Sequence, residues 1–470
     1  MAPSGPCNPS ERGPDGADAN RIAHRCTPLA LLAFLLVAFA SPLAAQNPNE
    51  PPKTTPKDAA GAADEQKAKE AFLAGKLDDA LKSLQAAVKA NPSMSPPKVT
   101  LARWSVETGN GQQARVLIEK AAADDPTHPD VFLTNASFSL AEGRITDTIL
   151  GCNAALLAIE SPRWDADTKK RYQREARLGL ATAFEMRDDH NSVKSHLVAL
   201  LESDPKNAGL RQRLARTNFQ LGRPEEAFAD LQTAVKDDPT LDPPQMSMAQ
   251  LWTAKHDFAK ADEWYSKAVA AHPNSAKVQR ALAGYLLDRG RIDTAKAHLT
   301  AAQKLEPTAK ETKALAGLVA RYTKDYTTAA TLFEELVKDY PSFGFGVVNL
   351  ALVLAESGDL TGKRRATELA ENYAKQNPRS AEARAVMAYC LFKAGRVADA
   401  EKVLRSIGGM GPLTPDAAYF VAVVLSERGA NEDAQKIVKA ACESKDGFVY
   451  RKDGEALLAK LDKLVPPPKK

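Results

Sequence analysis

The stretch that decides the fold is Gly75 to Pro92, GKLDDALKSLQAAVKANP, because a distant stretch, Gly290 to Pro307, GRIDTAKAHLTAAQKLEP, repeats its pattern. Both read Gly-x-apolar-x-x-Ala-x-x-x-Leu-x-x-Ala-x-x-x-x-Pro. The apolar and small residues recur at helical spacing, so the pattern predicts an amphipathic helix between a glycine and a proline. The glycine suits the left-handed backbone that ends a preceding helix, and the proline ends the following one.

The pattern recurs eleven times, mostly at intervals of 34 residues. Its central residue falls at Ala80, Ala114, Thr148, Val193, Ala227, Ala261, Ala295, Ala329, Ala366, Ala400 and Ala434. A second small residue, such as Ala68 or Gly317, stands about twelve positions earlier in almost every unit. Small residues on two helices let the backbones approach closely, so each unit is predicted to be a pair of packed helices.

Two insertions interrupt the period. Eleven extra residues precede Ala181, around Ser161 to Trp164. Because eleven residues make about three helical turns, the first helix of the fourth unit is expected to be longer without losing its buried face. Three extra residues near Thr361 to Lys363 are expected to lengthen the turn of the ninth unit.

A helix pair repeated every 34 residues resembles the tetratricopeptide repeat family, and the resemblance covers about residues 61–448. It implies an all-α, right-handed solenoid in which the first helices line a concave groove that binds peptides or protein surfaces. A further amphipathic helix over 449–464, with Leu457, Leu458 and Leu461, suits the cap that an open solenoid end requires.

The amino terminus predicts export. Residues 28–40, PLALLAFLLVAFA, are an apolar run that follows Arg21 and Arg25 and precedes the small residues of a cleavage site, so 1–45 is interpreted as a signal peptide cut after Ala45. The alternative is an uncleaved membrane anchor formed by residues 28–43. The proline-rich stretch 46–60 is predicted to be a disordered linker, and 465–470 a disordered tail.

Composition and motifs argue against most chemistry. The net charge of +4 over 470 residues is too small for a nucleic-acid binder. The seven His show no metal-ligand spacing, and the phosphate-loop-like Gly358 to Arg364 lacks the residue that holds magnesium, so no metal, no cofactor and no enzyme activity are expected. Cys152, Cys390 and Cys442 are interpreted as buried small hydrophobic residues, although a disulfide between two of them is possible.

The candidate site is the groove. In the geometry that the resemblance implies, the positions three before and one, four and five after the small residue of each first helix point inward. In units seven to eleven these positions include two arginines and six apolar or aromatic residues. They are Arg280, Arg321, Val348, Leu352, Tyr389, Phe392, Tyr419 and Val423. Aromatic residues at helical spacing are also common in cores, so both interpretations stand.

These features predict an exported, non-enzymatic interaction scaffold of the periplasm or cell envelope. Its expected partner is a protein or peptide, not nucleic acid, and it meets the membrane only if the leader stays uncleaved. The alternative is a periplasmic subunit of a polysaccharide-export or envelope-assembly system whose catalytic chain is separate.

Overall fold

The structure, a computed structural model, describes residues 61–92, 94–357 and 359–465. The predicted signal peptide, the linker and residues 466–470 of the tail lie outside the described residues. The described chain divides after Leu251 into two compact units, called here the N-terminal unit and the C-terminal unit.

The described residues are all-α, with 23 helices and no strand, as the sequence predicts. The N-terminal unit contains α3 (Ala62–Leu73), α4 (Leu77–Ala90), α5 (Pro97–Glu107), α6 (Gly111–Asp124), α7 (Pro129–Ala141), α8 (Ile145–Ala158), α9 (Ala166–Met186), α10 (His190–Ser203), α11 (Ala208–Gln220) and α12 (Pro224–Asp237). Helix α13 (Pro244–Ala254) runs across the boundary. The C-terminal unit contains α14 (Phe258–Ala271), α15 (Ala276–Asp288), α16 (Ile292–Leu305), α17 (Lys310–Tyr322), α18 (Tyr326–Asp339), α19 (Gly344–Glu356), α20 (Leu360–Gln376), α21 (Ala381–Lys393), α22 (Val397–Arg405), α23 (Pro415–Glu427), α24 (Asn431–Glu443) and α25 (Arg451–Leu464).

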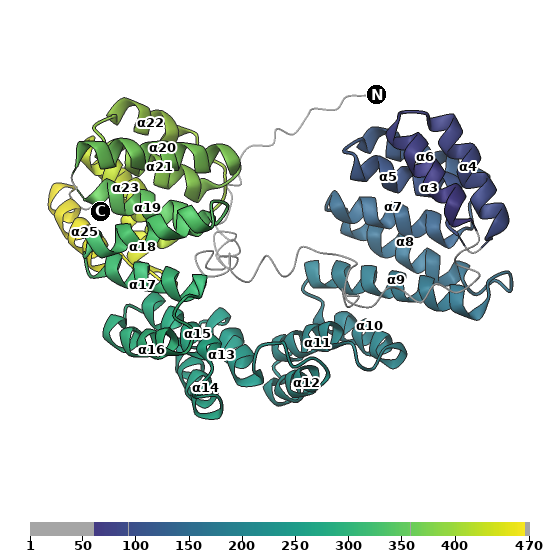
Figure 1. The fold of residues 1–470 in the computed structure, drawn as a ribbon, viewed down its shortest axis with the longest axis horizontal. Helices are drawn as coiled ribbons and strands as arrows, with labels where there is room; N and C mark the ends of the chain where they lie inside the picture. The colour runs from purple at the N-terminus through teal and green to yellow at the C-terminus, as the bar shows by residue number, and fades with distance from the viewer. Residues whose placement is uncertain (1–60, 93, 358, 466–470) are drawn as a thin grey trace, which may run out of the picture. The chain divides into compact units, whose positions relative to one another are not determined.

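Within each unit successive helices pack as antiparallel pairs, from α3 with α4 to α23 with α24 (Figure 1). The eleven central residues of the sequence pattern are all buried. The small residues of the first helices are buried against them, for example Ala68 in α3 and Ala283 in α15. The repeat period is therefore the spacing of the helix crossings, which confirms the predicted fold class.

The turn inside each pair has one backbone conformation. The residue five before the central residue has a positive φ in ten of the eleven units. In the ninth unit the insertion places the glycine, Gly358, eight before Ala366, and this residue lies outside the described residues. Seven of the ten are glycine, and the exceptions are Asp188, His256 and Lys324. In a typical turn the Lys76 N–H donates to the Ala71 carbonyl, which satisfies the end of the first helix.

The first insertion behaves as predicted. Helix α9 has 21 residues, against 13 in the neighbouring first helices α7 and α11, and it keeps Tyr172, Ala176 and Leu180 buried.

The expectation for the second insertion is wrong. Thr361 to Lys363 do not lengthen a turn but lie inside α20, which has 17 residues where α18 has 14. Asp359 accepts hydrogen bonds from the Thr361 and Gly362 N–H groups, so it caps α20 and starts the helix early enough to absorb the three residues.

An additional helix follows the last repeat, as the sequence predicts. Helix α25 begins at Arg451, two residues later than the predicted start at 449, and packs on α24 and α23. Leu461 is buried, and Leu457 and Leu458 pack partly buried against the same cluster. The start is later because the N–H groups of Val449 and Tyr450 donate to Asp416 of α23.

Candidate protein-binding groove

The eight predicted groove residues lie on α15, α17, α19, α21 and α23 of the C-terminal unit. They differ in exposure. Arg321, Leu352 and Tyr389 are buried, whereas Val348, Phe392, Tyr419 and Val423 are half-buried and the Arg280 side chain is 15% exposed. The buried residues are covered by other residues of the same chain. The contacts of each residue therefore determine whether it is available to a partner.

Arg280 joins neighbouring repeats. Its guanidinium forms an ion pair with Glu306 at 2.5 Å, and it donates to Thr312 Oγ1 at 3.3 Å. Glu306 follows α16 in the connection to α17, and Thr312 lies in α17. The charge of Arg280 is therefore already matched inside the unit.

Arg321 lies deeper. It donates to Asn349 Oδ1 at 2.5 Å, and its guanidinium carbon is 5.5 Å from the centre of the Tyr450 ring. A guanidinium at this distance from an aromatic ring gains a cation–π interaction. Arg321 thus links α17 to α19 and to the segment that precedes α25.

Tyr389 is a polar core residue. Its hydroxyl donates to the Glu356 carboxylate, which also pairs with Lys393 Nζ at 3.1 Å. Burial raises the pKa of the Tyr389 phenol, so the group is a neutral hydrogen-bond donor. Its ring lies 4.6 Å from that of Phe420 on α23.

The segment Ser444–Tyr450, called here the inner loop, covers this face at the end of the unit. The N–H groups of Val449 and Tyr450 donate to Asp416 Oδ1 at 3.0 and 3.2 Å. The Tyr450 ring stacks on Tyr419 with centroids 5.1 Å apart, and it meets Phe420 edge-on at 5.2 Å. A segment of polypeptide therefore lies against predicted groove residues.

The tip of the inner loop reaches repeats that are far away in the sequence. Lys445 offers its carbonyl to Arg289 Nη1 at 3.0 Å, and the Asp446 carboxylate is 3.6 Å from His256 Nδ1. A Cβ on Gly447 would lie 3.0 Å from the Asp288 Cβ, so only glycine fits there without displacement. The loop thus joins the last repeat to the end of α15 and to the turn before α14.

Two carboxyl groups beneath the loop have raised pKa values. Burial, followed by the charge of Asp416, raises the pKa of Asp288 to about 8. Burial also raises the pKa of Asp416 to about 6, although Arg321 and the N–H groups of Val449 and Tyr450 oppose the change. Both groups cost free energy when they ionise at this face.

The first helices of the N-terminal unit are joined by a separate polar cluster. Arg103 of α5 pairs with the buried Asp130 of α7 at 2.7 Å, and the Tyr172 hydroxyl of α9 donates to the same carboxylate at 3.1 Å. Burial alone would raise the pKa of Asp130, but the charge of Arg103 and the hydrogen bonds around it hold the pKa below its usual value. Farther along, Arg213 of α11 pairs with Glu185 of α9 at 2.9 Å. These contacts stabilise neighbouring repeats.

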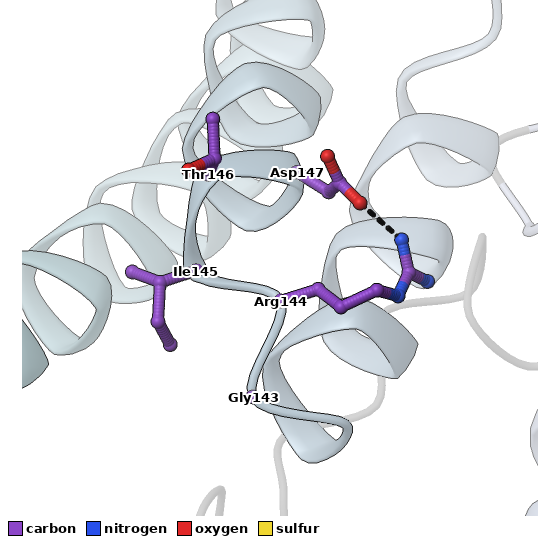
Figure 2. Close-up of a pocket in the computed structure, with 5 residues that line it drawn as sticks. All are labelled: Gly143, Arg144, Ile145, Thr146 and Asp147. Carbon is purple, nitrogen blue, oxygen red and sulfur yellow. Dashed lines mark hydrogen bonds and ion pairs between the residues drawn. The ribbon is translucent and has the colours of Figure 1, made fainter. Parts of the chain in front are cut away.

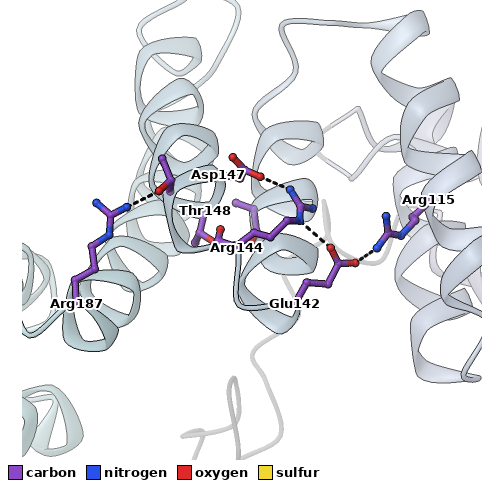
Figure 3. Close-up of polar contacts among 8 residues, drawn as sticks. Arg115, Glu142, Arg144, Asp147, Thr148 and Arg187 are labelled. Atoms are coloured by element: carbon purple, nitrogen blue, oxygen red, sulfur yellow. Dashed lines mark hydrogen bonds and ion pairs between the residues drawn. The ribbon is translucent and has the colours of Figure 1, made fainter. Parts of the chain in front are cut away.

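An open surface depression lies at the turn between α7 and α8 (Figure 2). It is lined by Gly143, Arg144, Ile145, Thr146 and Asp147. Arg144 bridges Asp147 and Glu142, and Glu142 also pairs with Arg115 of α6 (Figure 3). Exposed ion pairs of this kind contribute about 0–1 kcal/mol. We interpret the hollow as the surface of a repeat turn.

Metal ligands, membrane-spanning helices and cysteines would be further functional features in the described part of the chain. It contains no group of three His, Cys, Asp or Glu residues placed to hold a metal ion, and none of its helices is long and apolar enough to span a membrane. Its three cysteines are free thiols. Cys152 and Cys390 are buried as predicted, and burial raises the pKa of Cys152 to about 11. The prediction for Cys442 is wrong, because that residue is half-buried beside the inner loop.

Sequence reasoning missed part of this face. Asp288 and Glu356 stand five positions after the small residues of their first helices, so the rule for inward positions already contained a signal for both. The inner loop follows the last repeat and obeys no repeat rule, so nothing in the pattern indicated that it would fold back onto α15.

Comparison with known proteins supports the repeat assignment. One tetratricopeptide repeat model matches residues 71–147 and 364–422, and a second matches residues 280–342. No curated protein matches the chain. Among solved structures, yeast Tom70 is 15% identical, with 86% of this chain and 96% of that chain covered and a TM-score of 0.34. A tetratricopeptide repeat protein from Parabacteroides merdae is 16% identical, with 62% of this chain and 99% of that chain covered and a TM-score of 0.36. YrrB, described as a tetratricopeptide repeat protein with an unusual peptide-binding site, is 21% identical, with 42% of this chain and 97% of that chain covered and a TM-score of 0.27.

Proposed function

We propose that the chain, whose matched segments are tetratricopeptide repeats, is a non-enzymatic scaffold that binds a segment of a partner protein on the inward residues of its first helices. The observation that supports this function is the inner loop. The face formed by α15, α17 and α23 already holds a polypeptide segment through main-chain hydrogen bonds, aromatic stacking and a cation–π contact. Such contacts suit the binding of a peptide segment from another protein.

The half-buried residues of the predicted groove are the best positions for a test. Tyr389 is a poor probe because it is buried, and its replacement by Ala is expected to lower stability by about 3–5 kcal/mol whatever the partner. Val348 and Phe392 are half-buried on first helices, whereas Leu305, at the end of the second helix α16, is 41% exposed. Leu305 therefore provides a control on the other helix of a repeat.

The experiment places a photo-crosslinking amino acid at 348, 392 or 305 of the full chain in its native cells. A scaffold of this kind is expected to yield the same crosslinked partner from 348 and 392 but not from 305. Crosslinks of equal yield from all three positions, or from 305 alone, would contradict binding by the first helices.

We further propose that the chain is exported and works in the periplasm or cell envelope, within an assembly or polysaccharide-export system whose catalytic chain is separate. The support is the leader, with its basic flank, its apolar run 28–40 and the cleavage site after Ala45. Amino-terminal sequencing of protein from the envelope fraction is expected to start at Gln46. An intact leader in that fraction would instead support anchoring by residues 28–43, and recovery from the cytoplasm alone would exclude export.

A further inference from the structure

We propose that His256, Asp288 and Arg289 form a recognition site for an acidic residue followed by glycine, that Asp446-Gly447 of the same chain occupies this site, and that a partner segment with this chemistry displaces it. This inference rests on the proposed function and names the kind of segment that the scaffold recognises.

Arg289 is held ready to bind a main-chain carbonyl. Its guanidinium carbon lies 3.6 Å from the centre of the Phe258 ring, which fixes the side chain at the end of α15. From there Nη1 donates to the Lys445 carbonyl at 3.0 Å. An arginine held over a ring loses less entropy when it forms a hydrogen bond, which favours recognition.

His256 occupies a strained position. Its φ is 56°, at a turn position where seven other units have glycine. A non-glycine residue in the left-handed region costs about 1–2 kcal/mol, and such strain is often found at functional sites. The ring faces the Asp446 carboxylate, with Nδ1 3.6 Å from Oδ1, and it forms an ion pair with that carboxylate when the imidazole is protonated.

The glycine of the bound segment is required by the shape of the site. Gly447 lies against the main chain of α15, where an added Cβ would be 3.0 Å from the Asp288 Cβ and 3.3 Å from the Asp288 carbonyl oxygen. Real Cβ contacts are seldom so short, and the backbone of a helix end cannot move away easily. The site therefore selects an acidic residue followed directly by glycine.

The tip of the inner loop can leave while its base stays in place. At the base, Arg451 donates to the carbonyls of Cys442 and Ser444 at 2.6 and 2.9 Å, and Phe448 is buried against Ala418 and Ala441. Within the loop, Asp446 exchanges two hydrogen bonds with Ser444 Oγ. Against α15 and the turn before α14, the tip is held by one hydrogen bond, one His–Asp contact and the fit of Gly447. Few contacts and partial exposure are typical of segments that open locally without global unfolding.

The test compares three full-length proteins: wild type, Gly447→Val and Gly408→Val. The first substitution pushes the tip off α15, whereas Gly408, also in a loop of the C-terminal unit, has only the Arg405 carbonyl oxygen within 4 Å, at 3.9 Å, and serves as the control. Release is measured by the rate of tryptic cleavage after Lys445. Binding is measured by the fluorescence anisotropy of a labelled peptide with the sequence of residues 443–450.

A covalently attached loop competes at high effective concentration, so the peptide is expected to bind Gly447→Val at least about tenfold more tightly than wild type or Gly408→Val. Faster cleavage after Lys445 is expected in Gly447→Val alone. Adding Arg289→Ala to Gly447→Val, or replacing Asp by Ala in the peptide, is expected to abolish binding.

Either of two results overturns the proposal: unchanged tryptic resistance in Gly447→Val, or a released loop with no gain in peptide binding. Asp446→Ala is a second release variant in case Gly447→Val does not fold. If the peptide fails to bind while crosslinks at 348 and 392 persist, the acidic-glycine site is wrong and the scaffold function stands. If those crosslinks are absent as well, the proposed function fails too.

Discussion

At the scale of single residues, the repeat depends on one left-handed position in each pair. Seven units place glycine there with φ between 68° and 80°, and three place Asp188, His256 or Lys324. The space around Gly290 is open, since no heavy atom would lie within 4 Å of an added Cβ. The cost of another residue at this position is therefore backbone strain and not a clash.

Two reciprocal substitutions test whether backbone strain at this turn position affects stability. Lys324→Gly is expected to raise the free energy of unfolding by about 0.5–1 kcal/mol, because it relieves strain and loses only an exposed ion pair with Asp453. Gly290→Ala is expected to lower the free energy of unfolding by about 1 kcal/mol. Urea unfolding of the full chain measures both. Equal effects of the same sign would mean that φ at this position does not govern stability.

At the scale of elements, the crossing of α17 and α18 shows why a small residue is needed on each first helix. Gly317 stands where other units have alanine, and Phe333 of the facing helix fills the space, with ring atoms 2.7–3.0 Å from a Cβ built on Gly317. Phe333 is fully buried. The larger side chain on one helix thus requires the smaller one on the other.

Gly317→Ala is expected to lower the free energy of unfolding by about 1–3 kcal/mol through overpacking against the Phe333 ring. Phe333→Leu alone leaves a cavity. Combined with Gly317→Ala, it is expected to recover part of the lost stability, because the smaller side chain makes room for the added methyl group. A double-mutant cycle by urea unfolding measures the coupling. Strict additivity of the two changes would show that the pair does not pack as described.

At the scale of the whole molecule, contacts between repeats distant in the sequence hold the C-terminal unit together. Asp288 is the last residue of α15 and Asp416 the second residue of α23, yet the charge of Asp416 contributes to the raised pKa of Asp288. A periodic stack in which each repeat touches only its neighbours would not produce this interaction. The end of α15 and the start of α23 therefore lie close enough for their charges to interact, and the inner loop contacts both.

The raised pKa values predict stability that falls with rising pH. The protonated carboxyls are favoured in the folded state, so their contribution is complete below the unfolded pKa of about 4 and is lost as pH rises through about 6 for Asp416 and about 8 for Asp288. The free energy of unfolding is expected to fall by at least about 1 kcal/mol between pH 5 and pH 8, and Asp288→Asn is expected to remove most of that fall.

Urea unfolding at both pH values checks this, with Asp433→Asn on the exposed face of α24 as the control that keeps the full pH dependence. The comparison is made between variants because burial lowers the pKa of His298, which acts in the opposite sense. A pH dependence that is identical in Asp288→Asn and wild type would contradict the assignment.

How much of the candidate site could be predicted differs from residue to residue. The rule for inward positions placed Arg321 and Tyr389 on first helices. It could not reveal that Arg321 contacts Tyr450 or that the Tyr389 hydroxyl donates its hydrogen bond to Glu356. Those contacts join residues more than 30 positions apart, and no local pattern encodes such a pairing. Asp288 was within reach of the rule, since it stands at an inward position.

The helix pairs, their crossings and their turns follow from the sequence, because helical periodicity, small residues such as Ala80 and turn glycines such as Gly75 act within one 34-residue unit. What covers the groove depends on the tertiary structure. The inner loop follows the last repeat, and its fit against Arg289, His256 and Asp288 depends on how six successive repeats bring distant surfaces together. Local sequence preferences act within one unit and do not set the distance between repeats that are not neighbours. That distance depends on how the helices of all the intervening repeats pack.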